Sequence, residues 1–125
     1  MGANCAHNWA MYWEGASVRS YTPERLAAIN AATVTYNGKE IGRYKATQMQ
    51  RAQERQIRAD KRAFLVAKES GQKDAEKAAA AKLAASRAKM KDFLSQTGLQ
   101  QYQLRESVPG FGRSEAASAA ARARK

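Results

Sequence analysis

Two residues near the N-terminus, Cys5 and His7, have the types that a catalytic or metal site requires. A thiolate can act as a nucleophile when an imidazole takes its proton, and residues two apart share one face of a strand. No acidic residue is clearly placed to orient His7, and no motif that stabilises an oxyanion is evident. A structural zinc ion needs four ligands, and the chain contains one cysteine and one histidine, so only a site shared with another chain remains open. We therefore expect no catalytic residues, no resident metal and no cofactor.

Other patterns that carry chemistry are also missing. The glycines in "NGKEIG" and "GFGR" match neither the GxxxxGK[ST] nor the GxGxxG phosphate-binding loop. The acidic residues are scattered and mostly flanked by Lys or Arg, which is typical of surface pairing and not of paired catalytic carboxylates. The sequence therefore predicts a non-enzymatic protein that works by binding.

The net charge indicates what such a protein would bind. The formal charge is +11, and residues 45–98 hold thirteen basic and six acidic side chains. Five basic residues of this region recur at helical spacing and form the densest basic face: Arg51, Arg55, Arg58, Lys61 and Arg62. Arginine forks onto phosphates or carboxylates, so we predict that this face binds nucleic acid or an acidic protein, although a solvated helical surface can have the same composition. No aromatic residue interleaves with the face, so we expect non-specific backbone contact with a duplex and no stacking on single strands.

The element that must position this face is a long αα-hairpin over residues 45–98. A helical period begins near Tyr44 and should stop at Ser70-Gly71. A second helix is predicted over about Lys73–Gln96, and Gly98 suits the left-handed residue that follows a helix. Two helices of about 24 residues would be roughly 35 Å long. Much of their apolar content is alanine, which predicts a thin core.

Residues 1–44 are predicted to form an aromatic-rich segment with two small elements. Thr22 and Pro23 are typical of a helix start, which favours a short helix over about Pro23–Ala31. Asn37-Gly38 follows alternating residues and predicts a tight β-hairpin turn. Three aromatic residues ahead of these elements would cover a core or fill a partner's pocket: Trp9, Tyr12 and Trp13.

The remaining residues, 99–125, change character. Pro109, Gly110 and Gly112 interrupt any helix, and the last dozen residues are mostly Ser, Ala and Arg. We expect a flexible basic tail that frays or becomes ordered on a partner. The expected fold is thus mainly α: a long αα-hairpin with a short N-terminal helix and a small β-hairpin. No apolar run is long enough for a membrane span.

Several stretches together resemble one family of tailed-phage proteins. "GANCAHNWAMYWEG" resembles its G-x-N-C-x-H segment with the aromatic residues that follow. "YTPERLAAINAATVTYNGKEIGRYKATQMQRAQERQIRADKR" resembles the downstream helix, hairpin and Q-x-Q-R-x-x-E-R-Q-I-R helix, and "FLSQTGLQ" and "VPGFGR" resemble its end. The family is phage minor capsid protein 2, a head component associated with the portal region. The resemblance covers about residues 2–113 and implies portal proteins, capsid proteins or DNA as partners and the virion as location.

Members of that family are longer, so the resemblance implies that this chain corresponds to their C-terminal part. A short basic phage protein without a catalytic set has a second possible role. It could inhibit a host nucleic-acid-guided nuclease, in the manner of an anti-CRISPR protein, by holding an acidic face of the nuclease complex or the nucleic acid itself. That alternative predicts action in the host cytoplasm, with no membrane partner.

Overall fold

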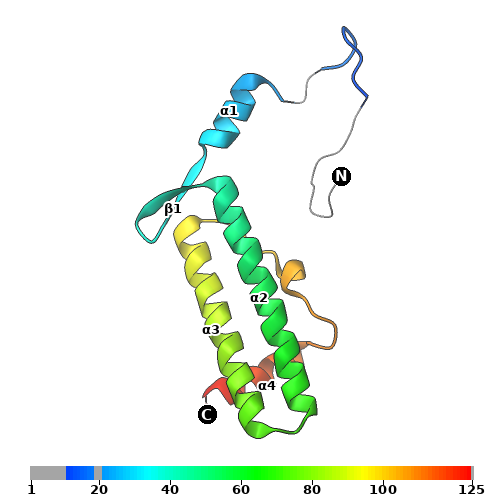
Figure 1. Ribbon diagram of the computed structural model, residues 1–125, viewed down its shortest axis with the longest axis vertical. Coiled ribbons are helices and arrows are strands. Elements are labelled where there is room, and N and C mark those ends of the chain that lie inside the picture. Colours follow the sequence, from blue (N-terminus) through cyan, green and yellow to red (C-terminus); the bar gives the residue numbers. More distant parts are fainter. Residues whose placement is uncertain (1–10, 19–20, 125) are drawn as a thin grey trace.

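The structure is a computed structural model that describes residues 11–18 and 21–124. The predicted fold class is confirmed: the described chain is mainly helical, with one long helical hairpin and one small β-hairpin (Figure 1). In chain order the elements are α1 (Pro23–Ala31), β1 (Thr33–Tyr36), β2 (Lys39–Gly42), α2 (Arg43–Glu69), α3 (Lys73–Thr97), a 3-10 turn η1 (Gln103–Glu106) and α4 (Arg113–Arg124).

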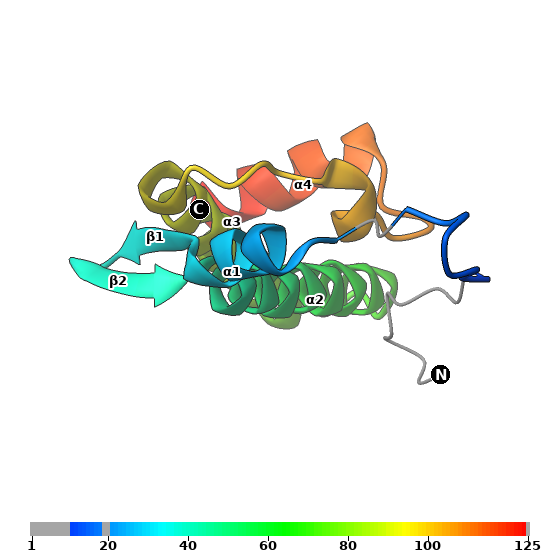
Figure 2. The same cartoon turned by 90° about the horizontal axis from the view of Figure 1, so that it is seen from above.

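The helices α2 and α3 run antiparallel, side by side, and form the body of the molecule (Figures 1 and 2). Gly71, with φ of 69°, makes the sharp turn between them, and Gly98, with φ of 66°, ends α3 in the left-handed conformation that its sequence predicts. The core lies along the seam, where the largest fully buried side chains are Ile57, Phe64, Leu83, Met90 and Phe93. Alanines fill most of the remaining contacts, so the core is thin, as expected.

The β-hairpin packs on the open end of this helix pair. Its strands are antiparallel with Tyr36 opposite Lys39, and the turn residues Asn37 and Gly38 have φ of 52° and 71°. Both positive values fit the tight turn that Asn-Gly predicts. The Tyr36 ring lies edge-to-face against Phe93 of α3, and the Asn37 N–H donates to Gln96 Oε1 at 2.8 Å. A two-stranded hairpin is marginal by itself, so these contacts supply the support that it needs.

The helix α1 has the predicted bounds and projects beyond the helix pair (Figure 1). Thr22 Oγ1 accepts the Arg25 N–H at 3.3 Å, which caps the helix start. All nine residues of α1 are exposed. Of the predicted aromatic cluster, Tyr12 and Trp13 are 55% and 67% exposed, whereas Trp9 lies outside the described residues. Neither described member therefore covers the core.

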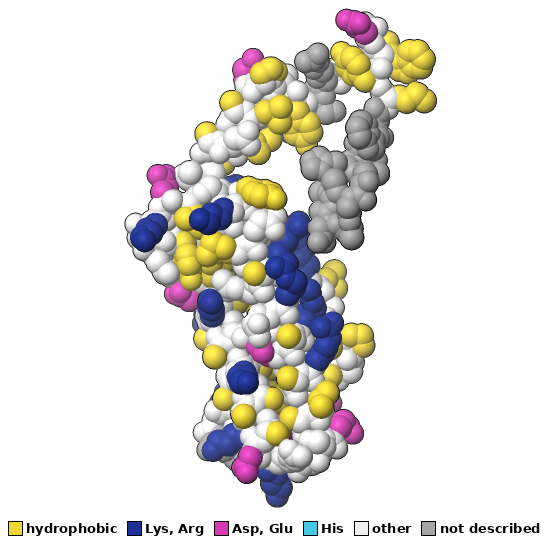
Figure 3. Space-filling model, viewed as in Figure 1, with side chains coloured by type: hydrophobic (Ala, Val, Ile, Leu, Met, Phe, Trp, Pro, Cys, Tyr) yellow, Lys and Arg dark blue, Asp and Glu magenta, His cyan; other side chains and the backbone are white. Residues whose placement is uncertain are grey.

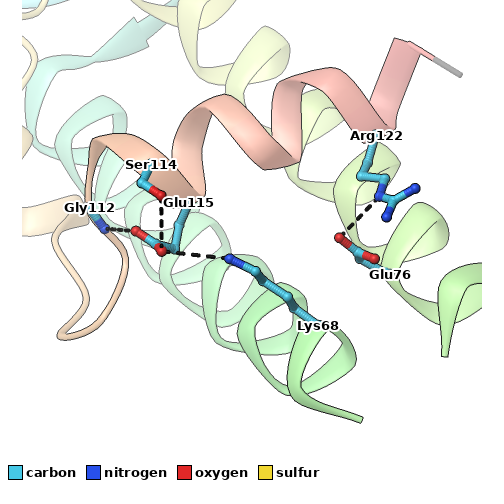
Figure 4. Close-up of polar contacts among 6 residues, drawn as sticks. All are labelled: Lys68, Glu76, Gly112, Ser114, Glu115 and Arg122. Atoms are coloured by element: carbon cyan, nitrogen blue, oxygen red, sulfur yellow. Dashed lines mark hydrogen bonds and ion pairs between the residues drawn. The ribbon is translucent and has the colours of Figure 1, made fainter. Parts of the chain in front are cut away.

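Residues 99–124 differ from the flexible tail that their composition predicts. They carry η1 and the twelve-residue helix α4, and α4 packs across the turn end of the helix pair (Figures 1 and 2). The Glu115 carboxylate accepts the Gly112 N–H at 3.1 Å and lies 3.7 Å from Lys68 Nζ, while Arg122 Nε donates to Glu76 Oε1 at 3.2 Å (Figure 4). With Ala119 buried beneath them, these contacts tie α4 to both long helices.

Within residues 11–18 and 21–124, no helix is both long enough and apolar enough to cross a membrane.

Candidate binding surfaces

Four of the five predicted basic residues form a surface along α2. Arg51, Arg55 and Arg62 are exposed and Arg58 is half-buried. Lys and Arg side chains gather in a band beside the upper half of the helix pair (Figure 3). None of Arg51, Arg55 and Arg62 forms an ion pair with a described carboxylate. Their guanidinium groups are therefore available to an external anion.

The structure adds one arginine that the sequence analysis missed. Arg105 of η1 lies over α2, where the Arg58 guanidinium donates to the Arg105 carbonyl oxygen and Arg105 Nη1 lies 4.0 Å from Glu54 Oε1. The Arg105 guanidinium also lies over the Tyr102 ring, 4.1 Å from its centroid. These side chains surround a shallow hollow of about 300 Å³, which is lined by Arg51, Glu54, Arg55, Arg58 and Arg105. We call these residues, together with Arg62 one turn beyond Arg58, the arginine face.

Glu54 is the one acidic member of the arginine face. It is only 3% exposed, and Oε1 has no hydrogen bond to a described residue. Burial raises the pKa of the Glu54 carboxyl, and the nearby Arg105 guanidinium partly counteracts that rise. Even with Glu54 ionised, four arginines against one carboxylate leave the hollow with a net positive charge.

Lys61 does not belong to the arginine face, so this part of the sequence prediction is wrong. It lies four residues after Ile57 and three before Phe64, which places it on the core side of α2. The side chain is 8% exposed, and Nζ donates to the Glu106 carbonyl oxygen. Burial lowers the pKa of the Lys61 ammonium, and the nearby Arg87 lowers it further. The spacing of Lys61 from the two core residues is the signal that could have revealed this.

Lys61 instead lies at a second surface, a cleft between α2, α3 and the segment that contains η1. The cleft has a volume of about 630 Å³. Three of its lining side chains are cationic: Lys61, Arg87 and Lys91. The other lining residues are Ile57, Met90, Leu94, Gln101, Gln103, Glu106, Ser107 and Phe111. We call this the cationic cleft. Its residues come from segments up to about fifty positions apart, so no local pattern predicts it.

The described residues offer nothing that resembles a metal site, since they contain no group of three His, Cys, Asp or Glu side chains able to hold an ion. The pair considered for catalysis, Cys5 and His7, lies outside the described residues. The expectation that the protein is not an enzyme therefore stays a prediction.

Comparison with known proteins gives one result. The family profile for phage minor capsid protein 2 matches residues 1–95, which is more than half of the chain. The match includes α1, the β-hairpin, α2 and nearly all of α3, and it ends before η1 and α4. The "VPGFGR" stretch thus lies beyond the matched residues, and the correspondence to the C-terminal part of longer members stays a prediction. No curated protein and no solved structure matches the chain.

Proposed function

Because the chain belongs to the phage minor capsid protein 2 family, we propose that it is a non-enzymatic virion component whose arginine face binds the phosphate backbone of packaged duplex DNA. The observation that carries this proposal is the exposed row Arg51, Arg55 and Arg62, none of which forms a salt bridge with a described carboxylate. Arg105 extends the row from a different element. The family supports association with other virion components, and the charge supports a polyanion among them.

The dimensions of the arginine face suit a duplex backbone. Arg51 and Arg62 are eleven residues apart, which corresponds to about 16 Å along a helix. Duplex DNA carries one negative charge per roughly 1.7 Å of axis, so each arginine along that length can reach a phosphate. No aromatic residue lines the hollow, and the nearby Tyr102 ring is covered by the Arg105 guanidinium. Binding by this face is therefore expected to be independent of sequence.

The test measures affinity for a fluorescein-labelled duplex of about 30 base pairs by anisotropy between roughly 50 and 200 mM NaCl. The double variant Arg51→Gln, Arg55→Gln removes two exposed charges and leaves the Arg58 contact with η1 intact. Each lost phosphate contact reduces the slope of log K against log salt by about 0.9, so the slope should become shallower by roughly 1.8.

A matched control carries Lys77→Gln and Lys82→Gln, which remove two exposed charges from α3 outside the arginine face. Its slope should stay within about 0.5 of the unmodified protein, because charges outside the contact release no counterions. Equal slopes for the two double variants would contradict the proposal, as would an acidic capsid or portal protein that binds the face more tightly than duplex DNA does.

Inhibition of a host nucleic-acid-guided nuclease stays a prediction from the sequence alone. The arginine face could also hold an acidic patch of such a nuclease. Copurification with virion proteins favours the structural role, whereas restored plaque formation on a host that carries the nuclease would favour inhibition.

A further inference from the structure

We propose that the cationic cleft is a second binding site, which takes an acidic peptide segment of a partner protein. A carboxylate of the peptide would lie between Lys61, Arg87 and Lys91, and a neighbouring apolar side chain would lie against the half-buried Leu94. This site is separate from the arginine face, and the inference does not depend on DNA binding there.

The size and lining of the cleft suit two neighbouring side chains of a peptide, one acidic and one apolar. Its volume of about 630 Å³ lies within the range of roughly 300–1,000 Å³ that is typical of ligand pockets. One wall is apolar: Leu94 of α3 is half-buried and lines the cleft, above the fully buried Ile57 of α2 and Met90 of α3. The other wall is the polar segment that contains η1. Such a mixture of one apolar wall and a few convergent charges is the usual character of a specific site.

The charges in the cleft are not balanced within the described chain. Three cations line it, whereas Glu106 is the one lining carboxylate. Glu106 is 7% exposed, and its Oε1 already accepts the Gln101 amide at 3.0 Å. An anion entering the cleft would therefore meet a net positive charge.

Among the described groups, the Glu106 carboxylate is the one anion that counteracts the positive charge of Lys61. The Lys61 ammonium has three donors, and the described residues supply one hydrogen-bond acceptor, the Glu106 carbonyl oxygen. The Nζ atom also lies 5.4 Å from the centroid of the Phe111 ring, a contact that Arg87 makes at 5.7 Å. The ring thus holds two cations at the cleft without neutralising either. A carboxylate beside them would satisfy the remaining donors and offset the cost of burying the ammonium.

The chemistry of the lining favours a peptide over nucleic acid. A nucleic-acid backbone offers phosphates but no aliphatic groups to bury against the half-buried Leu94. The Phe111 ring, which a base could stack on, is already edge-on to Phe64, with centroids 6.1 Å apart, and carries the two cations. A segment that combines Glu or Asp with Leu or Phe supplies both the charge and the apolar surface.

The test uses a fluorescein-labelled, end-blocked peptide of alternating Glu and Leu, and a second peptide in which Gln replaces every Glu. Anisotropy of the unmodified protein should show binding of the first peptide and at least about tenfold weaker binding of the second, because the charge-assisted contacts are lost. The double variant Arg87→Gln, Lys91→Gln should also lose at least about tenfold in affinity for the Glu peptide.

A matched control on the same helix is Lys77→Gln with Lys89→Gln, since neither side chain lines the cleft. Its affinity for the Glu peptide should stay within about twofold of the unmodified value. Amide shifts of the isotope-labelled unmodified protein should change mainly in residues 57–61, 87–94 and 101–111. Circular dichroism confirms that each variant remains folded.

Four results would overturn the inference. The first is failure of the unmodified protein to bind the Glu peptide at millimolar concentration, and the second is equal affinity of that protein for the Glu and Gln peptides. The third is equal affinity of the cleft and control double variants for the Glu peptide. The fourth is a set of amide shifts centred on the arginine face. Duplex DNA that displaces the peptide and shifts the cleft amides would assign the cleft to nucleic acid instead. Loss of DNA binding by the arginine-face variant without loss of peptide binding would separate this inference from the proposed function.

Discussion

Phe93 of α3 lies edge-to-face against Tyr36 of β1, with ring centroids 5.0 Å apart and ring planes at 67°. Phe93 is fully buried, and the Tyr36 ring covers it from the hairpin side. The contact joins residues 57 positions apart in the sequence and connects the β-hairpin to the helix pair. The hairpin thus closes the core at the open end of the long helices, as α4 does near their turn.

Replacing Tyr36 by alanine should uncouple the hairpin from α3. An aromatic pair contributes about 0.5–1.5 kcal/mol beyond the burial of its area, so the variant should lose roughly 1–3 kcal/mol of unfolding free energy in urea titration. Tyr44→Ala is a suitable control because Tyr44 is 78% exposed, and its cost should be below about 0.5 kcal/mol. Equal losses in the two variants would show that the Phe93 contact does not stabilise the fold.

The carboxyl group of Glu54 should make stability depend on pH. Burial raises its pKa in the folded protein, so the ionised form is disfavoured by folding and stability falls as pH rises through that raised value. Glu54→Gln should therefore increase the thermal midpoint at pH 7. The gain should disappear below about pH 4, where the Glu54 carboxyl is protonated in both the folded and the unfolded protein. A decrease at pH 7 would mean that the ion pair with Arg105 outweighs the burial cost.

The same substitution tests the electrostatics of the arginine face. Glu54→Gln removes the one negative charge lining the hollow, so affinity for duplex DNA should rise at low salt. The anisotropy assay described for the arginine variants measures this directly. An unchanged affinity would place the DNA contact away from the hollow.

Glu115 should control the attachment of α4. Its carboxylate accepts the Gly112 N–H and faces Lys68, and hydrogen bonds from the backbone lower the pKa of the Glu115 carboxyl (Figure 4). Loss of such a cap weakens the start of a helix, so Glu115→Ala should accelerate amide exchange in residues 113–124 by roughly 2- to 30-fold. Exchange in the middle of α2 should be unchanged.

The lowered pKa of the Glu115 carboxyl predicts how the attachment of α4 depends on pH, which provides a second measurement. Because the folded pKa lies below the ordinary value of 4.5, the contribution of Glu115 is present above that value and is lost as pH falls through the folded pKa. Exchange in α4 of the unmodified protein, corrected for its intrinsic pH dependence, should therefore approach that of Glu115→Ala at low pH. Glu69→Ala at the exposed end of α2 provides the control, with no change expected in α4.

Local chemistry in the sequence was sufficient to predict the elements. Thr22 and Pro23 start α1, Asn37-Gly38 turns the hairpin, and Gly98 ends α3, because each depends on the backbone preferences of one or two residues. The exposed arginines of α2 were also predictable, since helical spacing alone places Arg51, Arg55 and Arg62 on one side of the helix.

Only the tertiary structure decided what residues 99–124 form and which residues cover Lys61. The tail has little apolar periodicity of its own, and it is held by contacts such as Arg122 with Glu76, 46 positions apart. Its course over α2 brings Arg105 to the arginine face and covers Lys61 with Glu106 and Phe111. Such contacts depend on packing between distant segments, and the spacing of residues within one segment does not determine them.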